Sequence, residues 1–367
     1  MTVNATSVSA GEALAVLQAG WQAQTHGGLT ASWMLHGRPG VGKTELVQTL
    51  ATQIDAQLFD LRLTTIDPQD LRGLPYFDHK TAKTIWYRPE DLPDTDAPAI
   101  LFLDELTAAA PSLQPTVYGL LQERRVGRHR LPDSVMIIAA GNRVEDGAIA
   151  YDMGTALSDR LIHMIVHADP EDWLKTYAMP AGIHPSVAAF IRTRPDLLET
   201  TEDALRRGQM IACTPRSWTR VSQIMHTIPD RAQRQVMIAG TIGAAPAAEF
   251  AFLADEIAAS VQIDAMLATA RGDRGPLYPK SLHGLTALVY GAVGAANPQT
   301  LPGLIEILAD LRHLSGTGHA GLPVSELASF GFEALISRAL DRGWQDAFAA
   351  SAAYADYAAE RQAAGLS

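Results

Sequence analysis

The run from Gly37 to Thr44, Gly-Arg-Pro-Gly-Val-Gly-Lys-Thr, is the strongest constraint on the fold of this chain. It fits the pattern G-x-x-x-x-G-K-[ST], in which glycines let successive backbone N–H groups point at phosphates. In this pattern Lys43 reaches the β- and γ-phosphates and the Thr44 hydroxyl is a ligand of Mg²⁺. The residues predicted to contact a nucleotide are Gly37, Arg38, Pro39, Gly40, Val41, Gly42, Lys43, Thr44 and Glu45.

The flanking sequence supports this interpretation over a simple glycine-rich turn. Residues 31–35 have the pattern of a short buried strand. Residues 44–54 have apolar side chains at helical spacing, and a helix that begins near Lys43 adds its positive end to the anion site. The sequence therefore predicts a strand, a phosphate loop and a helix in succession.

The composition is that of a globular chain long enough for two or three domains. It has 367 residues, of which 47% are hydrophobic and 19% charged, with a net charge of −11. The acidic balance argues against a general nucleic-acid coat, although it leaves room for a local basic groove. The single cysteine, Cys213, excludes an internal disulfide and is typical of a reducing compartment. With no signal-peptide pattern and no apolar run of about 18 residues, we expect a cytoplasmic protein without a membrane span.

The first half of the chain alternates between strand and helix patterns, which predicts an α/β fold with a parallel sheet. Residues 67–93 contain one glycine and four prolines and are predicted to be irregular, with one short helix. Residues 124–131 are predicted to form a hairpin. The predicted strands are 31–35, 58–63, 99–103, 135–140 and 161–166, and the predicted helices are 9–24, 44–54 and 112–123.

After Asp169 the patterns are almost entirely helical. We predict a nucleotide-binding α/β domain over 1–168, a helical domain over 169–244 and a helical extension over 245–367. The segment 269–284 contains Gly272, Gly275, Pro276 and Pro279 and is predicted to be a loop or linker. The alanine-rich segment 347–364 is predicted to be a helix.

Two further strands end in side chains suited to phosphate chemistry. The apolar strand 99–103 leads into Asp104, placed to hold Mg²⁺, and Glu105, placed to deprotonate an attacking water. The alternative is that Asp104 caps a helix. The strand 135–140 leads through Gly141 into Asn142, which could bind the γ-phosphate or that water; the alternative is an ordinary turn asparagine.

In order and spacing, these motifs resemble an AAA+ ATPase, and the segments between them resemble the MoxR group. The resemblance covers about residues 29–240. It is carried by Asp70-Leu-Arg-Gly-Leu-Pro75 through Ile85-Trp-Tyr-Arg-Pro89 (the helix-2 insert), Tyr118-Gly-Leu-Leu-Gln-Glu-Arg-Arg-Val126 (leading into the hairpin before sensor 1), Ala156-Leu-Ser-Asp-Arg-Leu161 (the arginine-finger segment) and Thr214-Pro-Arg-Ser-Trp218 (the sensor-2 helix of a lid).

The resemblance implies ATP as ligand, Mg²⁺ as its ion and a role for each matching residue. It implies that Asp104 and Glu105 are the Walker B pair and that Asn142 is sensor 1. It implies that Arg216 reaches the γ-phosphate within one subunit and that Arg160 reaches the nucleotide of a neighbour. Arg143 is a rival finger, and surface roles are the alternatives for Arg160 and Arg216.

The family pattern also implies a homo-oligomeric ring, a hexamer, that remodels or activates a protein partner. The partner implied is a protein with a von Willebrand A domain, and the activity implied includes metal or cofactor insertion. The alternatives are a nucleic-acid motor and a nucleotide-gated scaffold with little turnover. The chain departs from the group where Leu106-Thr107-Ala108-Ala109 replaces Ile-Asn-Arg-Ala and where Leu161 replaces Phe after Arg160.

Three smaller features have two interpretations each. The basic cluster Arg124, Arg125, Arg128, His129 and Arg130 predicts either a solvated hairpin or a contact with a substrate strand, nucleic acid or an acidic partner. Trp86 and Tyr87 predict either core packing or contact with a substrate. His163 and His167 lie on a strand that runs into a loop, so we do not expect them to share a metal.

Overall fold

The computed structural model describes residues 3–143, 158–314 and 318–363, which form two compact units. Unit 1 comprises Met1–Asp169 with Thr201–Gly208, and unit 2 comprises Pro170–Thr200 with Gln209–Ser367. The chain first passes from unit 1 to unit 2 after Asp169. Among the described residues, no helix is long and apolar enough to cross a membrane.

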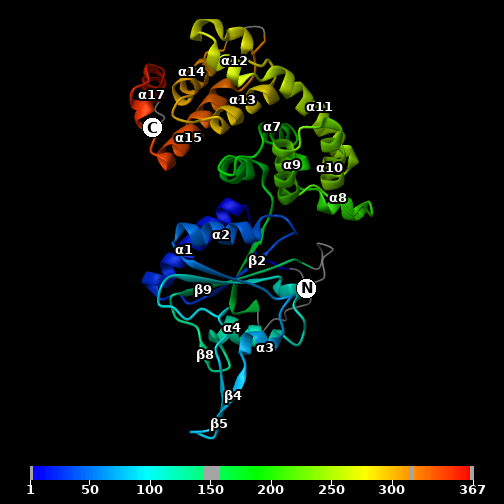
Figure 1. The fold of residues 1–367 in the computed structure, drawn as a ribbon, viewed down its shortest axis with the longest axis vertical. Helices are drawn as coiled ribbons and strands as arrows, with labels where there is room; N and C mark the ends of the chain where they lie inside the picture. The colour runs from blue at the N-terminus through cyan, green and yellow to red at the C-terminus, as the bar shows by residue number, and fades with distance from the viewer. Residues whose placement is uncertain (1–2, 144–157, 315–317, 364–367) are drawn as a thin grey trace. The chain divides into compact units, whose positions relative to one another are not determined.

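Unit 1 is built on a sheet of six parallel strands, which confirms the predicted α/β class (Figure 1). The short first strand at its edge was not predicted, since two residues give no periodic pattern. In order across the sheet the strands are β1 (Ser7–Val8), β10 (Leu161–Val166), β2 (Ser32–His36), β9 (Val135–Gly141), β6 (Ala99–Asp104) and β3 (Gln57–Arg62).

Alternating side chains of the central strands pack into two separate apolar layers. On β6, Ile100 and Phe102 join the cluster formed with α1 (Ala10–Gly27) and α2 (Lys43–Gln53). Leu101 and Leu103 join the cluster formed with α4 (Gln114–Glu123) on the opposite face (Figure 1). Because both faces are covered, every residue of β6 is apolar until Asp104, where the strand leaves the core.

Two hairpins and a short helix lie at the end of unit 1 that is drawn lowest in Figure 1. They are α3 (Pro68–Arg72), the hairpin of β4 (Pro75–Asp78) with β5 (Lys83–Trp86), and the hairpin of β7 (Arg125–Val126) with β8 (His129–Arg130). The second hairpin and the short helix were predicted. The β4–β5 hairpin was not, because its exposed strands lack the apolar alternation that marks a half-buried sheet.

The predicted solvated hairpin is wrong for one of its arginines. Arg124 is only 9% exposed, and its Nη2 donates to the carbonyls of Pro132 at 2.9 Å and Val135 at 2.6 Å. Burial lowers the pKa of its guanidinium, with opposing effects from the charges of Asp133 and Arg130. Arg124 therefore anchors the root of the β7–β8 hairpin, whereas Arg125, Arg128 and Arg130 are exposed.

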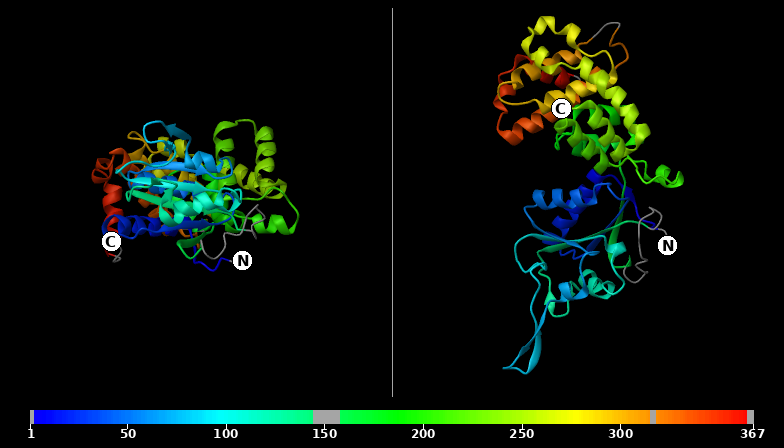
Figure 2. Two further views of the ribbon diagram at one scale, coloured as in Figure 1. Left: turned by 90° about the horizontal axis from the view of Figure 1, so that it is seen from below. Right: turned by 45° about the vertical axis from the view of Figure 1, so that its right-hand side comes forward.

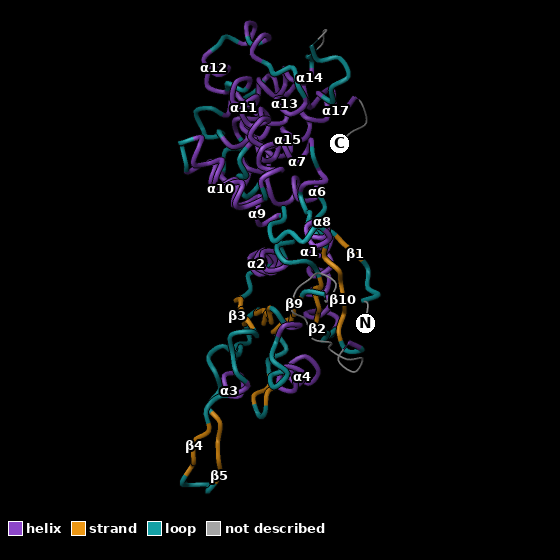
Figure 3. The backbone as a smooth tube through the Cα atoms, turned by 90° about the vertical axis from the view of Figure 1, so that its right-hand side faces the viewer, coloured by secondary structure: helices purple, strands orange, loops and turns teal. Residues whose placement is uncertain are grey.

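Unit 2 is helical in its described parts, as expected for the chain after Asp169 (Figure 3). Its helices are α6 (Pro170–Asp172) continuing into a π-helical turn (Trp173–Ala178), α7 (Pro185–Thr193), α9 (Pro215–Thr227), α10 (Arg231–Ile242), α11 (Ala244–Ser260), α12 (Ile263–Ala268), α13 (Leu282–Gly294), α14 (Leu301–Arg312), α15 (Val324–Arg342), α16 (Asp346–Ala349) and α17 (Ala352–Ala363). The predicted single helix over 347–364 is thus two helices, separated at residues 350–351. Cys213 is buried, which raises the pKa of its thiol to about 11 and makes it a packing group.

The predicted division near Ala244 lies inside unit 2, at the start of α11. The ring of Phe250 on α11 lies 5.5 Å from that of Phe190 on α7 and 5.7 Å from that of Trp218 on α9, and all three are fully buried. The same helix also contacts α13. A shared aromatic core therefore joins the helices before and after residue 244.

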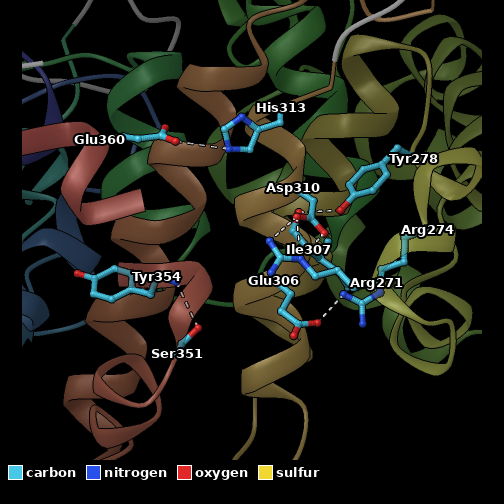
Figure 4. A network of polar contacts seen from close by, with 10 residues as sticks. All are labelled: Arg271, Arg274, Tyr278, Glu306, Ile307, Asp310, His313, Ser351, Tyr354 and Glu360. Carbon is cyan, nitrogen blue, oxygen red and sulfur yellow. Dashed lines mark hydrogen bonds and ion pairs between the residues drawn. The ribbon is translucent and has the colours of Figure 1, made fainter. Parts of the chain in front are cut away.

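The segment 269–284, predicted to be a loop or linker, is irregular but firmly held (Figure 4). The side chain of Arg274 is 6% exposed; its Nε donates to the carbonyls of Met266 and Thr269, and its Nη1 pairs with Glu306 at 2.9 Å. The hydroxyl of Tyr278 donates to the carbonyl of Ile307 at 2.9 Å. These contacts fasten the segment to α12 and α14, so it is part of the helical core of unit 2.

We expect Arg274→Met to lower the free energy of unfolding by about 2–4 kcal/mol, because two buried carbonyls and Glu306 lose their donor. Urea unfolding followed by circular dichroism measures this change. The control is Arg271→Met, which breaks a more exposed pair with Asp310 and should cost about 1 kcal/mol or less. Equal effects of the two substitutions would contradict the anchoring role of Arg274.

Candidate nucleotide site

The predicted phosphate loop connects the carboxyl end of β2 to the start of α2. Gly40 and Gly42 have φ values of +80° and +107°, which side-chain-bearing residues rarely adopt. Gly37 is required for a different reason: a Cβ there would lie 2.5 Å from the backbone oxygen of Val166 on β10. Glu45 lies exposed in the first turn of α2, so its backbone N–H belongs to the anion-binding end of that helix while its carboxylate faces water.

The Lys43 ammonium is held at the centre of the loop. The side chain is 8% exposed, and Nζ donates to the carbonyl of Gly37, to that of Arg38 at 3.1 Å and to Oδ1 of Asn142 at 3.0 Å. An ammonium has three hydrogens to donate, so these three acceptors satisfy it. The structure thus brings the predicted lysine and the predicted strand-ending asparagine into direct contact.

Thr44 and Asp104 form an oxygen pair beside the loop. Thr44 Oγ1 lies 3.4 Å from Oδ2 of Asp104, and Asp104 Oδ1 accepts from the backbone N–H of Glu105 at 2.9 Å. Partial desolvation, and then the charge of Asp104, raise the pKa of Asp60 on β3. A hydroxyl and a carboxylate in a locally negative field fit Mg²⁺, which prefers oxygen ligands.

Glu105 lies beside this pair in an unusual backbone conformation. Its φ of +59° places a non-glycine residue in the left-handed region, which is characteristic of functional sites. Its carboxylate accepts a hydrogen bond from Thr64 Oγ1 and lies 3.8 Å from Nε of Arg62. Sequence reasoning missed both partners, because they follow from the register in which Arg62 pairs with Asp104 across neighbouring strands.

The strand-ending residue Asn142 is braced by Thr107. Thr107 Oγ1 donates to the backbone carbonyl of Asn142 at 2.9 Å. Gly141 makes room for this contact, since a Cβ there would lie 2.6 Å from the same hydroxyl. Thr107 stands where the MoxR pattern has asparagine, so this departure supplies a hydrogen bond to the site.

The three candidate arginines lie in three different places. Arg143 follows Asn142 at the carboxyl edge of the sheet and is half-buried. Arg160 is exposed and directly precedes β10, at the amino edge. Arg216 is exposed in the first turn of α9, in unit 2. Ala156 and Leu157 of the predicted finger segment lie outside the described residues.

The parallel register separates Arg160 from the phosphate loop of its own subunit. Leu161 pairs with Ser32 at the start of β2, while Ile165 pairs with His36 next to the loop. Four residues of strand correspond to roughly 13 Å. Lys43, Thr44, Asp104, Glu105 and Asn142 thus gather at one edge, and Arg160 lies at the other.

Three further contacts in this part of unit 1 were not foreseen. Arg38 Nη2 pairs at 2.8 Å with Glu202 of α8 (Thr201–Arg206), a helix of unit 1 that the chain supplies from beyond residue 200. His36 Nε2 lies 2.9 Å from Nδ1 of His163, while His167 Nδ1 lies 3.0 Å from Ser7 Oγ. His163 on β10 and His167, which follows this strand, thus each have their own hydrogen-bond partner. None of these contacts has a local sequence signal, since each joins residues more than 120 positions apart.

Comparison with known proteins finds a match in the part of the chain that contains these site residues. Residues 32–163 match the family model AAA_3, described as "ATPase family associated with various cellular activities (AAA)". These residues are similar to the ATPase domain that the model describes. They carry the phosphate loop, the Asp104–Glu105 pair and Asn142 described above.

The curated relatives are similar over part of the chain. An uncharacterized protein of Staphylococcus aureus strain USA300 is 27% identical over 157 residues, 38% of this chain and 56% of the relative, so the chain spans just over half of that relative's length. "ATPase family gene 2 protein homolog B" of Mus musculus is 33% identical over 104 residues, 28% of this chain and 12% of the relative.

Among solved structures, a putative ATPase from Cytophaga hutchinsonii is 16% identical, with a TM-score of 0.35, over 65% of this chain and 82% of that one. The A156S mutant of Thermotoga maritima RuvB is 14% identical, with a TM-score of 0.40, over 79% and 83%.

We expect Gly37→Ala to weaken ATP binding about tenfold or more, because its Cβ would press against the Val166 carbonyl and displace the loop. Titration with a fluorescent ATP analogue measures this loss. The control is Gly27→Ala at the end of α1, where nothing lies within 4 Å of the added Cβ and affinity should not change. Unchanged affinity of Gly37→Ala would refute the steric role of this glycine.

Proposed function

We propose that the chain is a MoxR-type AAA+ ATPase that hydrolyses ATP between subunits of a ring and uses the cycle to remodel or activate a protein partner. One observation carries the proposal: Arg160 and the phosphate loop lie at opposite edges of one parallel sheet. A subunit built in this way can present its arginine to a neighbour's nucleotide, and head-to-tail repetition of such a contact closes a ring.

Each residue at the carboxyl edge has a part in this reaction. Lys43 binds the β- and γ-phosphates, and the N–H groups of the loop bind the others. Thr44 and Asp104 would hold Mg²⁺, which neutralises charge on the phosphates when bound. Glu105 accepts the proton of the attacking water, and Asn142, already in contact with Lys43, orients that water or the γ-phosphate.

The hydrogen bond from Thr64 to Glu105 suggests a resting restraint on the base. The donated hydrogen bond occupies one oxygen of the carboxylate. Glu105 must exchange this partner for the water before hydrolysis. Thr64 therefore acts through Glu105 as a positioning residue.

Arg160 is favoured over Arg143 as the finger that acts on a neighbour. Arg143 is next to Asn142, at the edge that holds its own subunit's phosphate loop, so it is suited to act within one subunit. Arg160 is exposed at the other edge. We assign Arg216, on the exposed side of α9, to the lid that completes the site, with residues 169–244 as the lid and 245–367 as a helical extension that serves the partner.

The partner class follows from the MoxR resemblance: a protein with a von Willebrand A domain, assisted in activation or in metal or cofactor insertion. The first rival function, a nucleic-acid motor, calls for a basic footprint that a net charge of −11 does not provide across the chain. The second, a scaffold without turnover, would not require Glu105 to be held in a strained conformation beside Asp104.

We expect Glu105→Gln to reduce hydrolysis by about 10²–10⁴-fold and Arg160→Ala by about 10³–10⁵-fold, with ATP binding retained in both. Steady-state hydrolysis, measured against protein concentration with mass photometry, should rise for the wild type as rings form. If wild-type hydrolysis per subunit did not change as rings form, a site between subunits would be contradicted, even if both variants lost activity.

Mixing the two inactive variants tests the interface directly. Random assembly gives about a quarter of neighbouring pairs one intact Glu105 and one intact Arg160, so about a quarter of wild-type activity should return. The matched control mixes Glu105→Gln with Arg143→Ala, which should stay inactive if Arg143 acts within its own subunit. Recovery in the control mixture alone would make Arg143 the finger.

We expect Thr64→Val to raise basal hydrolysis several-fold, because Glu105 loses the donor that holds its carboxylate. A hydrogen bond to a charged group is worth about 1.5–3 kcal/mol, which bounds the effect. Multiple-turnover kinetics at saturating ATP measures it, with Thr65→Val as the neighbouring control. A fall in rate would mean that Thr64 holds Glu105 in its working position.

A further inference from the structure

The two hairpins of unit 1 form one continuous surface. Nη1 of Arg88, after β5, donates to the carbonyl of Arg130 on β8 at 3.1 Å. Gly127, in the β7–β8 turn, faces the side chain of Arg72, since two atoms of that side chain would lie 3.9 Å from a Cβ added to Gly127. The Arg72 guanidinium in turn lies 4.4 Å from the centre of the Trp86 ring on β5. We call residues 72–88 with 125–130 the hairpin surface.

One face of the β4–β5 hairpin is apolar and exposed. The pairing of Tyr76 with Ile85, and of Leu74 with Tyr87 beyond it, places these four side chains on the same face. Leu74 is 70% exposed, Tyr87 is 61% exposed, and the Tyr76 and Tyr87 rings stack with centres 4.6 Å apart. Figures 1 and 2 show this hairpin extending away from the sheet of unit 1.

The hairpin surface is also strongly basic in an acidic chain. It carries seven Lys or Arg residues and one Asp, whereas the whole chain has 29 Lys and Arg against 40 Asp and Glu. Arg88 pairs with Asp94 and Arg125 with Glu123. No described residue forms an ion pair with the other five, which are all exposed: Arg72, Lys80, Lys83, Arg128 and Arg130.

The outer edge of β5 is the better of the two strand edges for pairing. In an antiparallel pair, successive residues direct their backbone N–H and C=O groups alternately toward the partner strand and away from it. The Tyr87 N–H donates to the Leu74 carbonyl, so Tyr87 faces the partner strand, and Trp86 and Thr84 on β5 direct their backbone groups outward. On β4 the outward positions are Phe77 and Pro75, and proline has no N–H to donate. No other strand of the described residues pairs with this two-stranded sheet.

We propose that the hairpin surface binds an extended, acidic segment of a protein client, which adds to the outer edge of β5. Backbone hydrogen bonds to Thr84 and Trp86 supply the pairing, the Tyr76–Tyr87 face takes alternate apolar side chains, and Lys80, Lys83 and Arg72 take the carboxylates. The proposal deepens the proposed function by naming the chemistry of the client. The apolar face of the hairpin includes the aliphatic side chains of Leu74 and Ile85, and the rest of the chain is acidic. Both features favour a polypeptide over a nucleic acid as the ligand.

Fluorescence anisotropy with the full-length protein tests this proposal. The probe is a labelled peptide of about eight residues, alternating Val and Glu, which is long enough for one strand. The comparison probes alternate Val with Lys and Ser with Glu, and a fourth probe is oligo(dT). We expect only the Val–Glu peptide to bind well. Preference for oligo(dT), or equal binding of the Val–Lys peptide, would overturn the proposal.

Variants separate the three parts of the proposed contact. Thr84→Pro removes the outward N–H, Tyr87→Ser removes the stacked ring and Lys83→Glu reverses a charge; each should weaken binding about tenfold or more. The matched controls are Thr84→Val, which keeps the N–H, and Phe252→Ser, which removes a 76% exposed ring from α11. Both controls should bind the peptide as the wild type does. If Thr84→Val lost as much affinity as Thr84→Pro, or Phe252→Ser as much as Tyr87→Ser, the proposed contact would be refuted.

Basal ATP hydrolysis, measured in the same samples, separates this proposal from the proposed function. Wild-type protein that hydrolyses ATP but binds none of the peptides would overturn the hairpin surface alone. Wild-type protein that binds the Val–Glu peptide without any hydrolysis would overturn the ATPase and leave the surface standing. Self-association that Tyr87→Ser abolishes, with no peptide binding, would make a second copy of the chain the occupant.

Discussion

The parallel direction of the sheet in unit 1 is the constraint on which the candidate site depends. Because all six strands point the same way, the residues at the ends of β2, β6 and β9 meet at one edge although they are about forty to one hundred positions apart in the chain. This arrangement brings Lys43 into contact with Asn142, and Thr44 into contact with Asp104, although the segments that carry them are distant in the sequence. It also determines which side chains lie far from the site, since whatever precedes a strand comes to the opposite edge, as Arg160 does.

Residues whose position in the fold follows from local patterns could be predicted well. The phosphate loop, the carboxylates after β6 and the asparagine after β9 each end an apolar strand, and the strand itself was visible as an uninterrupted run of buried residues. The parallel fold followed from the alternation of such runs with helical segments. The buried packing of Gly37 could not be foreseen in the same way, because its conformation is ordinary and the atom that excludes a side chain belongs to β10.

The features that escaped prediction depend on distant partners or on exposed backbone. Thr64 and Thr107 look like ordinary polar residues until the register places them against Glu105 and Asn142. The β4–β5 hairpin has no core beneath it, so the periodic burial that reveals a strand is missing from its sequence. In unit 2, glycines and prolines between 269 and 284 suggested a linker, yet two side chains of that segment, Arg274 and Tyr278, fix it to the neighbouring helices.

The membership of α8 in unit 1 determines how the chain can be divided. The polypeptide passes between the units at 169–170, 200–201 and 208–209, so no single cut separates them. A fragment that stops at residue 169 keeps the phosphate loop but loses Glu202, the partner of Arg38. The same topology connects the loop to unit 2 through the covalent chain. If Arg38 moves and carries α8 with it through Glu202, the movement reaches unit 2 along the backbone at 200–201 and at 208–209. Cleavage at both 200–201 and 208–209 would interrupt that route while leaving the predicted catalytic side chains in place.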